Sequence, residues 1–87
     1  MSNETVAANL RQLAEDFAQG KASAQEFAAG LSMHSGALEG MDYRQFKESQ
    51  TVQAQIEQAV ESNRESDIDR EAVLNWLYSW IAKIPAL

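Results

Sequence analysis

The sequence predicts an all-α protein in which residues 1–87 form a single domain, an antiparallel bundle of four helices. Three observations support this prediction. Apolar residues recur every three or four positions in four separate segments, as they do along one face of a helix. Serine, aspartate and glycine stand where such helices would begin and end. No segment shows the alternation of apolar and polar residues, rich in β-branched side chains, that a strand needs.

The first predicted helix covers residues 3–19. Its apolar positions are spaced by four, three and four residues: Val6, Leu10, Leu13 and Phe17. Ser2 or Asn3 can cap the start of this helix through a side-chain oxygen. We expect the helix to end at Gly20, because glycine is the residue that most often follows the last turn.

The second predicted helix opens with Ser23 and Glu26, which have the spacing of a capping box. In that motif each of the two side chains accepts a hydrogen bond from a backbone amide at the start of the helix. The apolar stripe behind it consists of Phe27, Leu31 and either His34 or Leu38. Gly36 or Gly40 ends the helix. Because only a few residues connect the first two helices, we expect them to pack as an antiparallel hairpin.

The third predicted helix starts at Asp42, whose side chain can cap it. Its apolar positions are Phe46, Val52 or Gln53, Ile56, Ala59 and Val60. Residues 47–51 are polar on every side of the helix. We therefore expect a kink near Ser49, or a division into two shorter helices there.

The fourth predicted helix begins after Asp67 or Asp69 and is stopped by Pro85. Its wide apolar face is formed by Val73, Trp76, Leu77, Trp80, Ile81 and Ile84. Tyr78 points away from this face, so it is a better candidate than either tryptophan for contact with a partner.

Composition and charge exclude several classes of function. The chain has no cysteine, so it cannot form a disulfide, a thiolate nucleophile or a cysteine-based zinc site. A formal charge of −6 argues against direct binding of nucleic acid or of a membrane surface, and favours a basic protein partner. The N-terminus lacks the pattern of a secretory signal, and residues 72–87 are too short to span a membrane. We expect a cytoplasmic protein that is a monomer when free.

No set of residues is matched for catalysis or metal binding. His34 is the only histidine, and a general base or a metal ligand normally works with defined partners. Glu65, Asp67 and Asp69 have the spacing of calcium ligands, but Arg70 stands where a calcium loop requires glycine. We therefore expect a protein that is not an enzyme and that uses no cofactor and no metal ion.

Acidic residues are concentrated in the second half of the chain. Residues 57–71 contain six acidic and two basic residues, a net charge of −4 out of the total of −6. Glu57, Glu61 and Glu65 are four residues apart and would form one anionic stripe if the third helix extended that far. Capping the fourth helix requires only one acid, either Asp67 or Asp69. The remaining acids are a surplus that we interpret as an interaction surface, and the alternative is an ordinary solvated face.

Residues 13–27, LAEDFAQGKASAQEF, resemble the opening helix hairpin of the colicin D-type immunity proteins, which follows the pattern L-x-x-x-F-x-x-G/S-K-I-S/T-A-x-E-F. Ala22 departs from this pattern, which prefers a larger branched residue there. Chain length, an acidic second half and a closing amphipathic helix are also similar. DNase-directed immunity proteins are also small and acidic, but their pair of tyrosines with a proline has no counterpart here.

The resemblance implies a four-helix immunity protein that binds the C-terminal toxic domain of a tRNA-cleaving bacteriocin or a contact-dependent toxin. In that family, acidic side chains act as phosphate mimics and occlude a basic, RNA-binding active site. No family motif specifies those acids in this sequence. Local charge density selects the partner-binding candidates, Glu57, Glu61, Glu65, Asp67 and Asp69, with Glu39 and Asp42 as further candidates.

Two other functions remain open at this point. A phage-encoded acidic inhibitor of a nucleic-acid-binding complex, such as a CRISPR effector, would use the same surface on a different target. A small helical assembly module would instead associate through exposed apolar faces.

Overall fold

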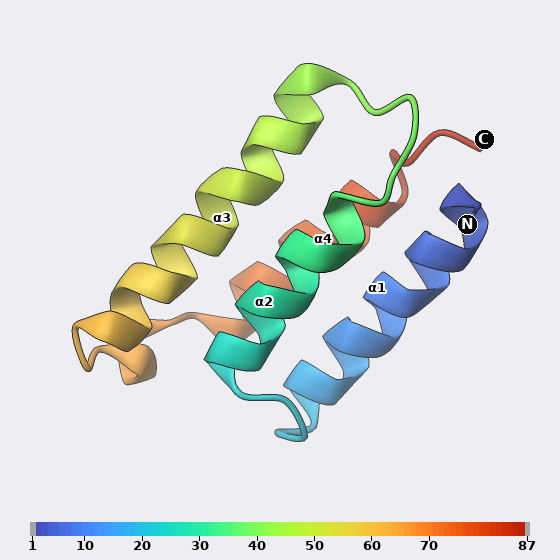
Figure 1. Cartoon of the computed structure of the whole chain (residues 1–87). Helices are drawn as coiled ribbons and strands as arrows, with labels where there is room; N and C mark the ends of the chain where they lie inside the picture. Colours follow the sequence, from blue (N-terminus) through green and yellow to red (C-terminus); the bar gives the residue numbers. More distant parts are fainter. Residues whose placement is uncertain (1, 87) are drawn as a thin grey trace.

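The computed structural model describes residues 2–86 and confirms the predicted fold class. Within those residues the chain forms four α-helices and no strand: α1 (Asn3–Ala18), α2 (Ala24–Ser35), α3 (Tyr43–Glu61) and α4 (Arg70–Ile81). A single 3-10 turn, η1 (Glu65–Asp67), lies between α3 and α4. Successive helices run in opposite directions, and the two ends of the chain lie near each other at one end of the bundle (Figure 1).

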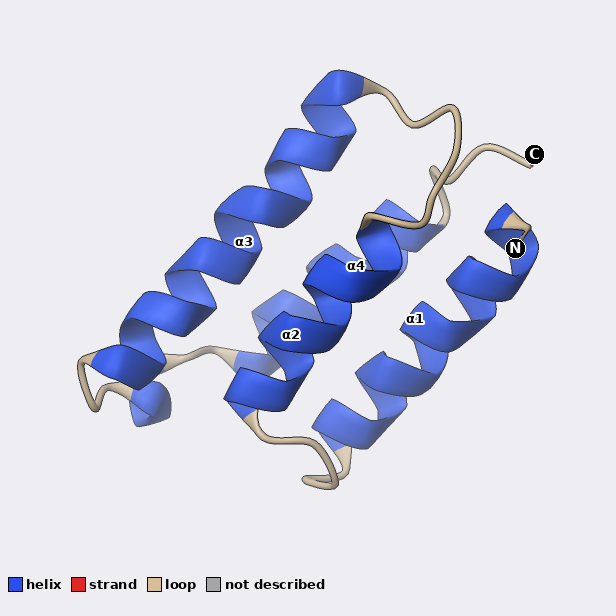
Figure 2. Cartoon of the chain, in the orientation of Figure 1, coloured by secondary structure: helices blue, strands red, loops and turns tan. Residues whose placement is uncertain are grey.

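Helix α2 packs closely against both α1 and α3, and α4 packs against α1. Connections between the helices are short, as Figure 2 shows, which is what an antiparallel arrangement of neighbouring helices allows. The predicted hairpin of the first two helices is therefore confirmed.

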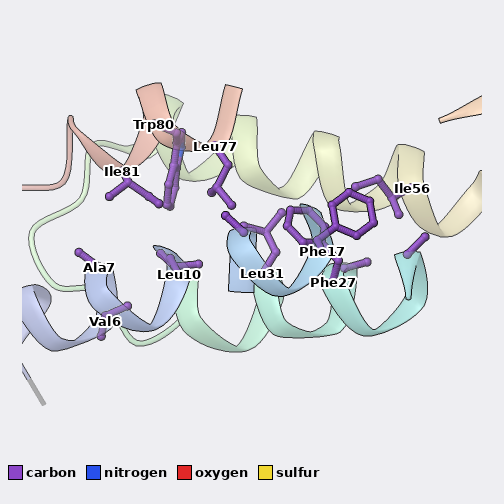
Figure 3. Close-up of a cluster of buried hydrophobic side chains, with 13 residues drawn as sticks. Val6, Ala7, Leu10, Phe17, Phe27, Leu31, Ile56, Leu77, Trp80 and Ile81 are labelled. Carbon is purple, nitrogen blue, oxygen red and sulfur yellow. The ribbon is translucent and has the colours of Figure 1, made fainter. Parts of the chain in front are cut away.

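The hydrophobic core runs along the length of the bundle (Figure 3). Phe17 and Phe27 stack with ring centroids 4.4 Å apart, and both side chains are fully buried. Trp80 is also fully buried, and the centroids of the Trp76 and Trp80 rings are 5.8 Å apart. Each large side chain that is buried in this way contributes about 1.5–3 kcal/mol to folding, so the aromatic residues stabilise the bundle substantially.

The caps of the first two helices follow the sequence patterns. The Ser2 hydroxyl accepts a hydrogen bond from the Thr5 amide at 3.2 Å, so Ser2 rather than Asn3 is the cap. Gly20 follows the end of α1 with a φ of +76°, a backbone conformation that favours glycine. In the capping box of α2, the Ser23 amide donates to Glu26 at 3.0 Å and the Glu26 amide donates to Ser23 at 3.1 Å.

The end of α2 resolves two alternatives that the sequence left open. Helix α2 ends before Gly36, and Gly40 lies in the following connector with a φ of +69°. Leu38 packs against the core, whereas His34 is half-buried in the last turn of the helix.

Helix α3 is a single helix of 19 residues, so the predicted division near Ser49 is wrong. Ser49 is buried, and its hydroxyl donates a hydrogen bond of 2.7 Å to the Phe46 carbonyl. This bond satisfies the polar side chain inside the bundle, and the lysine, glutamate and glutamine around it are good helix formers. A polar stretch therefore continues the helix.

Helix α4 is capped by Asp69, whose carboxylate accepts a hydrogen bond from the Ala72 amide at 3.1 Å. Asp67 instead ends the 3-10 turn. Helix α4 stops at Ile81, earlier than the predicted end before Pro85, and residues 82 and 83 form a turn.

Candidate acidic binding surface

The predicted interaction surface lies where the chain passes from α3 to α4. Residues 57–71 form the last turn of α3, the connector with η1 and the first turn of α4. In Figure 1 this segment is orange and lies at the end of the bundle away from the two termini. Every acidic residue in it is solvent-exposed.

Two of the acids are used to stabilise helices. Asp69 caps α4, as predicted for one of the two aspartates. Glu65 accepts a hydrogen bond of 3.3 Å from the Ala24 amide, which belongs to the first turn of α2. A carboxylate at a helix N-terminus satisfies a free amide and interacts favourably with the helix dipole. Glu65 therefore joins the connector to α2.

The predicted three-residue anionic stripe does not form. Helix α3 ends at Glu61, and the Arg64 amide turns back to donate to the Ala59 carbonyl at 2.7 Å. Asn63, in the same turn, has a φ of +56°. Because of this turn, Glu65 does not continue the row of Glu57 and Glu61.

Arg70 is the only basic residue in the first turn of α4, and its side chain contacts α1. Its Nη1 donates to the Phe17 carbonyl at 3.1 Å, and its guanidinium lies 4.7 Å from the centre of the Phe17 ring. The Phe17 carbonyl belongs to the last turn of α1, where the helix dipole favours a positive charge. These contacts anchor the acidic segment to the first helix.

Four acids make no capping hydrogen bond. Glu71 lies in the first turn of α4, and Glu57, Glu61 and Asp67 lie on two sides of the α3 terminus. Glu57 and Glu61 line a depression between α3 and α2, together with Gln25, Ala29 and Val60. The Glu57 carboxylate also accepts a hydrogen bond of 3.1 Å from Gln53, one turn earlier on the same exposed surface. Asp67 lines a second, more apolar groove on the other side.

This second groove has a volume of about 350 Å³ and lies between α3, η1 and α4. Its apolar lining consists of Val52, Ile56, Ala59, Ile68, Ala72 and Val73. Arg64, Asp67 and Asp69 stand among its polar residues. Ile56 belongs to the core at the same end as Phe17 and Phe27 (Figure 3), so the groove opens directly above the core.

Hydrogen bonds join α3 and α4 at the ends of these helices that lie away from η1. Trp80 donates through Nε1 to the Gln45 carbonyl at 2.8 Å, and the Gln45 side chain donates to the Trp80 carbonyl at 3.1 Å. Trp76 donates through Nε1 to the Glu48 carboxylate at 2.5 Å. The two large indole side chains therefore span the space between the helices. Toward η1 the facing side chains are smaller, such as Ala59 and Ala72, and the space stays open.

The two further candidates, Glu39 and Asp42, lie at the opposite end of α3. This helix of 19 residues is about 28 Å long, so they are not part of the surface at its C-terminus. Asp42 caps α3 by accepting a hydrogen bond of 2.8 Å from the Arg44 amide. The Glu39 backbone is held by Asn3, which accepts from the Glu39 amide at 2.9 Å and donates to its carbonyl at 2.7 Å.

The exposed aromatic and apolar residues are only partly those that the sequence indicates. Tyr78 is 45% exposed, in agreement with its predicted orientation. Met33 and Tyr43 are even more exposed, and sequence analysis did not single them out. Ile68 is half-buried and packs against the core, which the sequence analysis did not predict. An isoleucine inside the acidic run ESDIDRE is a signal that one face of this run meets an apolar surface.

Among residues 2–86, no three histidine, aspartate or glutamate side chains gather in a way that could hold a metal ion. The capping box lowers the pKa of Glu26, because the Ser23 amide and hydroxyl both stabilise the carboxylate. In the described part of the chain, no helix is both long enough and apolar enough to cross a bilayer.

Comparison with known proteins leaves the family open. No family model, no curated protein and no solved structure matches this chain. The resemblance of residues 13–27 to the immunity hairpin therefore stays a prediction.

Proposed function

We propose that this chain is an immunity protein that binds and neutralises the nuclease domain of a bacteriocin or a contact-dependent toxin. The substrate of that nuclease is proposed to be tRNA, in keeping with the hairpin pattern of residues 13–27. Exposed carboxylates at the end of α3 would occupy the basic site that otherwise binds RNA phosphates.

One observation carries this proposal. Glu57, Glu61 and Asp67 are exposed and cap no helix, and they surround the α3 terminus next to two depressions. Like-charged neighbours four residues apart destabilise a helix slightly, and the one side-chain contact of the pair is the hydrogen bond from Gln53 to Glu57 on the exposed surface of α3. A cluster of this kind steers a basic protein toward it and increases the association rate.

Growth rescue in a bacterial host tests the proposal. If the proposal holds, a gene beside this one encodes the toxin, and tightly regulated expression of its nuclease domain should stop growth and cleave tRNA. We expect co-expression of this protein to restore growth and to leave the tRNA intact. Rescue should be lost in the double variant Glu57→Lys and Glu61→Lys.

The matched control is the double variant Glu4→Lys and Glu15→Lys, which changes the net charge equally at exposed positions of α1. It should still rescue growth. Absence of rescue by the folded wild-type protein would refute the proposal. Equal loss of rescue in both double variants would show that net charge, rather than the α3 terminus, is responsible.

A further inference from the structure

We propose that the groove between α3, η1 and α4 receives one apolar side chain of the partner, an aliphatic or aromatic residue flanked by lysine or arginine. This inference rests on the proposed function and adds to it. The carboxylates would attract the basic partner, and the groove would select the partner that presents the correct apolar residue.

The groove is short, and its length limits what can enter it. Its α3 wall extends from Val52 to Ala59, which is about 10 Å along a helix axis. Its volume of about 350 Å³ lies at the lower end of the range for small-molecule sites. A long helix of a partner would not fit into such a short groove, whereas a side chain on a loop or at a helix end would.

The lining is apolar and incompletely covered. Val52, Ala59, Ile68 and Val73 are half-buried, and only Ile56 among the branched residues is fully shielded from water. An apolar side chain that entered the groove would remove both its own surface and the surface of these residues from water, which favours binding.

Charge at the rim determines which residues should flank the inserted side chain. Asp67 and Asp69 lie on the rim with Arg64 as the one base among the residues that line the groove. Glu57, Glu61 and Glu65 add further negative charge around the same terminus. A lysine or arginine beside the inserted residue would be attracted to this rim, and an acidic neighbour would be repelled.

The groove is already formed in the free protein. Trp76 and Trp80 hold one end through their hydrogen bonds to Glu48 and Gln45, and Glu65 holds the connector at the other end through α2. Little ordering is then required when the partner binds, which is favourable for affinity. A large aromatic side chain that fills a pocket within a polar rim also matches the usual anatomy of protein interfaces.

Peptide titration tests the inference. Three synthetic peptides would carry the same lysine and arginine residues around one central position, which is leucine, tryptophan or serine. Binding is followed through the backbone amide NMR signals of the protein. We expect the leucine and tryptophan peptides to bind at least about ten-fold more tightly than the serine peptide, a ratio that corresponds to about 1.4 kcal/mol. The signals of Val52, Ile68 and Val73 should shift most.

Two variants fill or alter the groove, and a third is the control. Ala59→Phe fills the groove and should abolish the preference for an apolar central residue. Val73→Ser makes its wall polar and should weaken that preference. Ala54→Phe places the same ring at an exposed position of α3 that does not line the groove, and the preference should persist. Near-ultraviolet circular dichroism of the two tryptophans verifies folding of each variant.

Equal binding of all three peptides to the wild-type protein would overturn the inference, as would a preference that persists in both groove variants. Self-association that Ala59→Phe abolishes would assign the groove to a second copy of the chain and would also overturn it.

The proposed function fails separately. Peptide binding that is insensitive to salt and to Glu57→Lys with Glu61→Lys would contradict the role of the acids and leave the groove preference intact.

Discussion

Arg70 contributes a positive charge to the acidic segment, but its contacts direct that charge into the fold. The guanidinium interacts with both the ring and the backbone carbonyl of Phe17. Such cation–π and hydrogen-bonding contacts each stabilise a protein by about 0.5–1.5 kcal/mol. Because Arg70 is exposed, we take the lower part of this range for the pair of contacts.

We predict that Arg70→Ala lowers the free energy of unfolding by about 1 kcal/mol, since both contacts with Phe17 are lost. Chemical denaturation measures this difference. Arg11→Ala, which removes an exposed arginine from α1, should change stability by less than about 0.5 kcal/mol. Equal effects of the two substitutions would show that the contacts with Phe17 add nothing to stability.

Glu26 makes the stability of the protein depend on pH. Its pKa in the folded state lies below the ordinary value of 4.5, because the carboxylate accepts hydrogen bonds from Ser23. A lowered pKa means that the charged form stabilises the fold above pH 4.5 and that this contribution is lost as the pH falls through the lowered pKa.

Glu26→Gln keeps a side chain that can complete the capping box but removes the charge. We predict that the wild-type protein is more stable than this variant above pH 4.5 and that the difference disappears at lower pH. Urea denaturation over the acidic range measures it. A difference that stays constant at every pH would contradict the prediction.

For the helices, the sequence predicts a cap correctly where the hydrogen-bond partner of the capping residue lies within a few residues along the chain. Ser2, Gly20 and the pair of Ser23 and Glu26 act within a single turn, and the structure has each of them in its predicted role. The break near Ser49 was wrong, because its buried hydroxyl finds an acceptor three residues away in Phe46. A polar side chain inside a helix is tolerated when it is satisfied in this way.

Glu65 connects two elements, since its carboxylate accepts from the first turn of α2 while it belongs to η1. We predict that Glu65→Ala lowers the free energy of unfolding by about 0.5–1 kcal/mol, as expected for a lost helix cap. Asp67→Ala, the matched change two residues away, should alter it by less than about 0.5 kcal/mol. Thermal denaturation distinguishes the two. A larger effect at Asp67 would contradict this division of roles.

For the whole molecule, the sequence predicted where acids are concentrated but could not show which of them are free. Glu65 is bonded to a residue 41 positions earlier, and no local pattern reveals that contact. Glu39 and Asp42 are separated from the other acids by the length of α3. The groove could not be predicted for the same reason, because Val52, Ile68 and Val73 come together only when the bundle forms.

The end of the bundle around the α3 terminus combines free carboxylates with an apolar groove. The two features would act at different stages of binding. Carboxylates attract a basic partner over a distance and mainly affect the association rate, and the groove would mainly affect the dissociation rate. An acidic surface that is only solvated needs no apolar groove beside it. The presence of both features therefore favours the proposed binding function.

The association rate constant with a purified tRNA-cleaving toxin domain, measured over a range of salt concentrations, tests the proposed acidic interface most directly. The rate should fall steadily as salt rises, because ions screen the attraction. At low salt, Glu57→Lys with Glu61→Lys should slow association by at least about ten-fold, and Glu4→Lys with Glu15→Lys should slow it much less. A rate that is independent of salt and the same for both double variants would contradict the proposal.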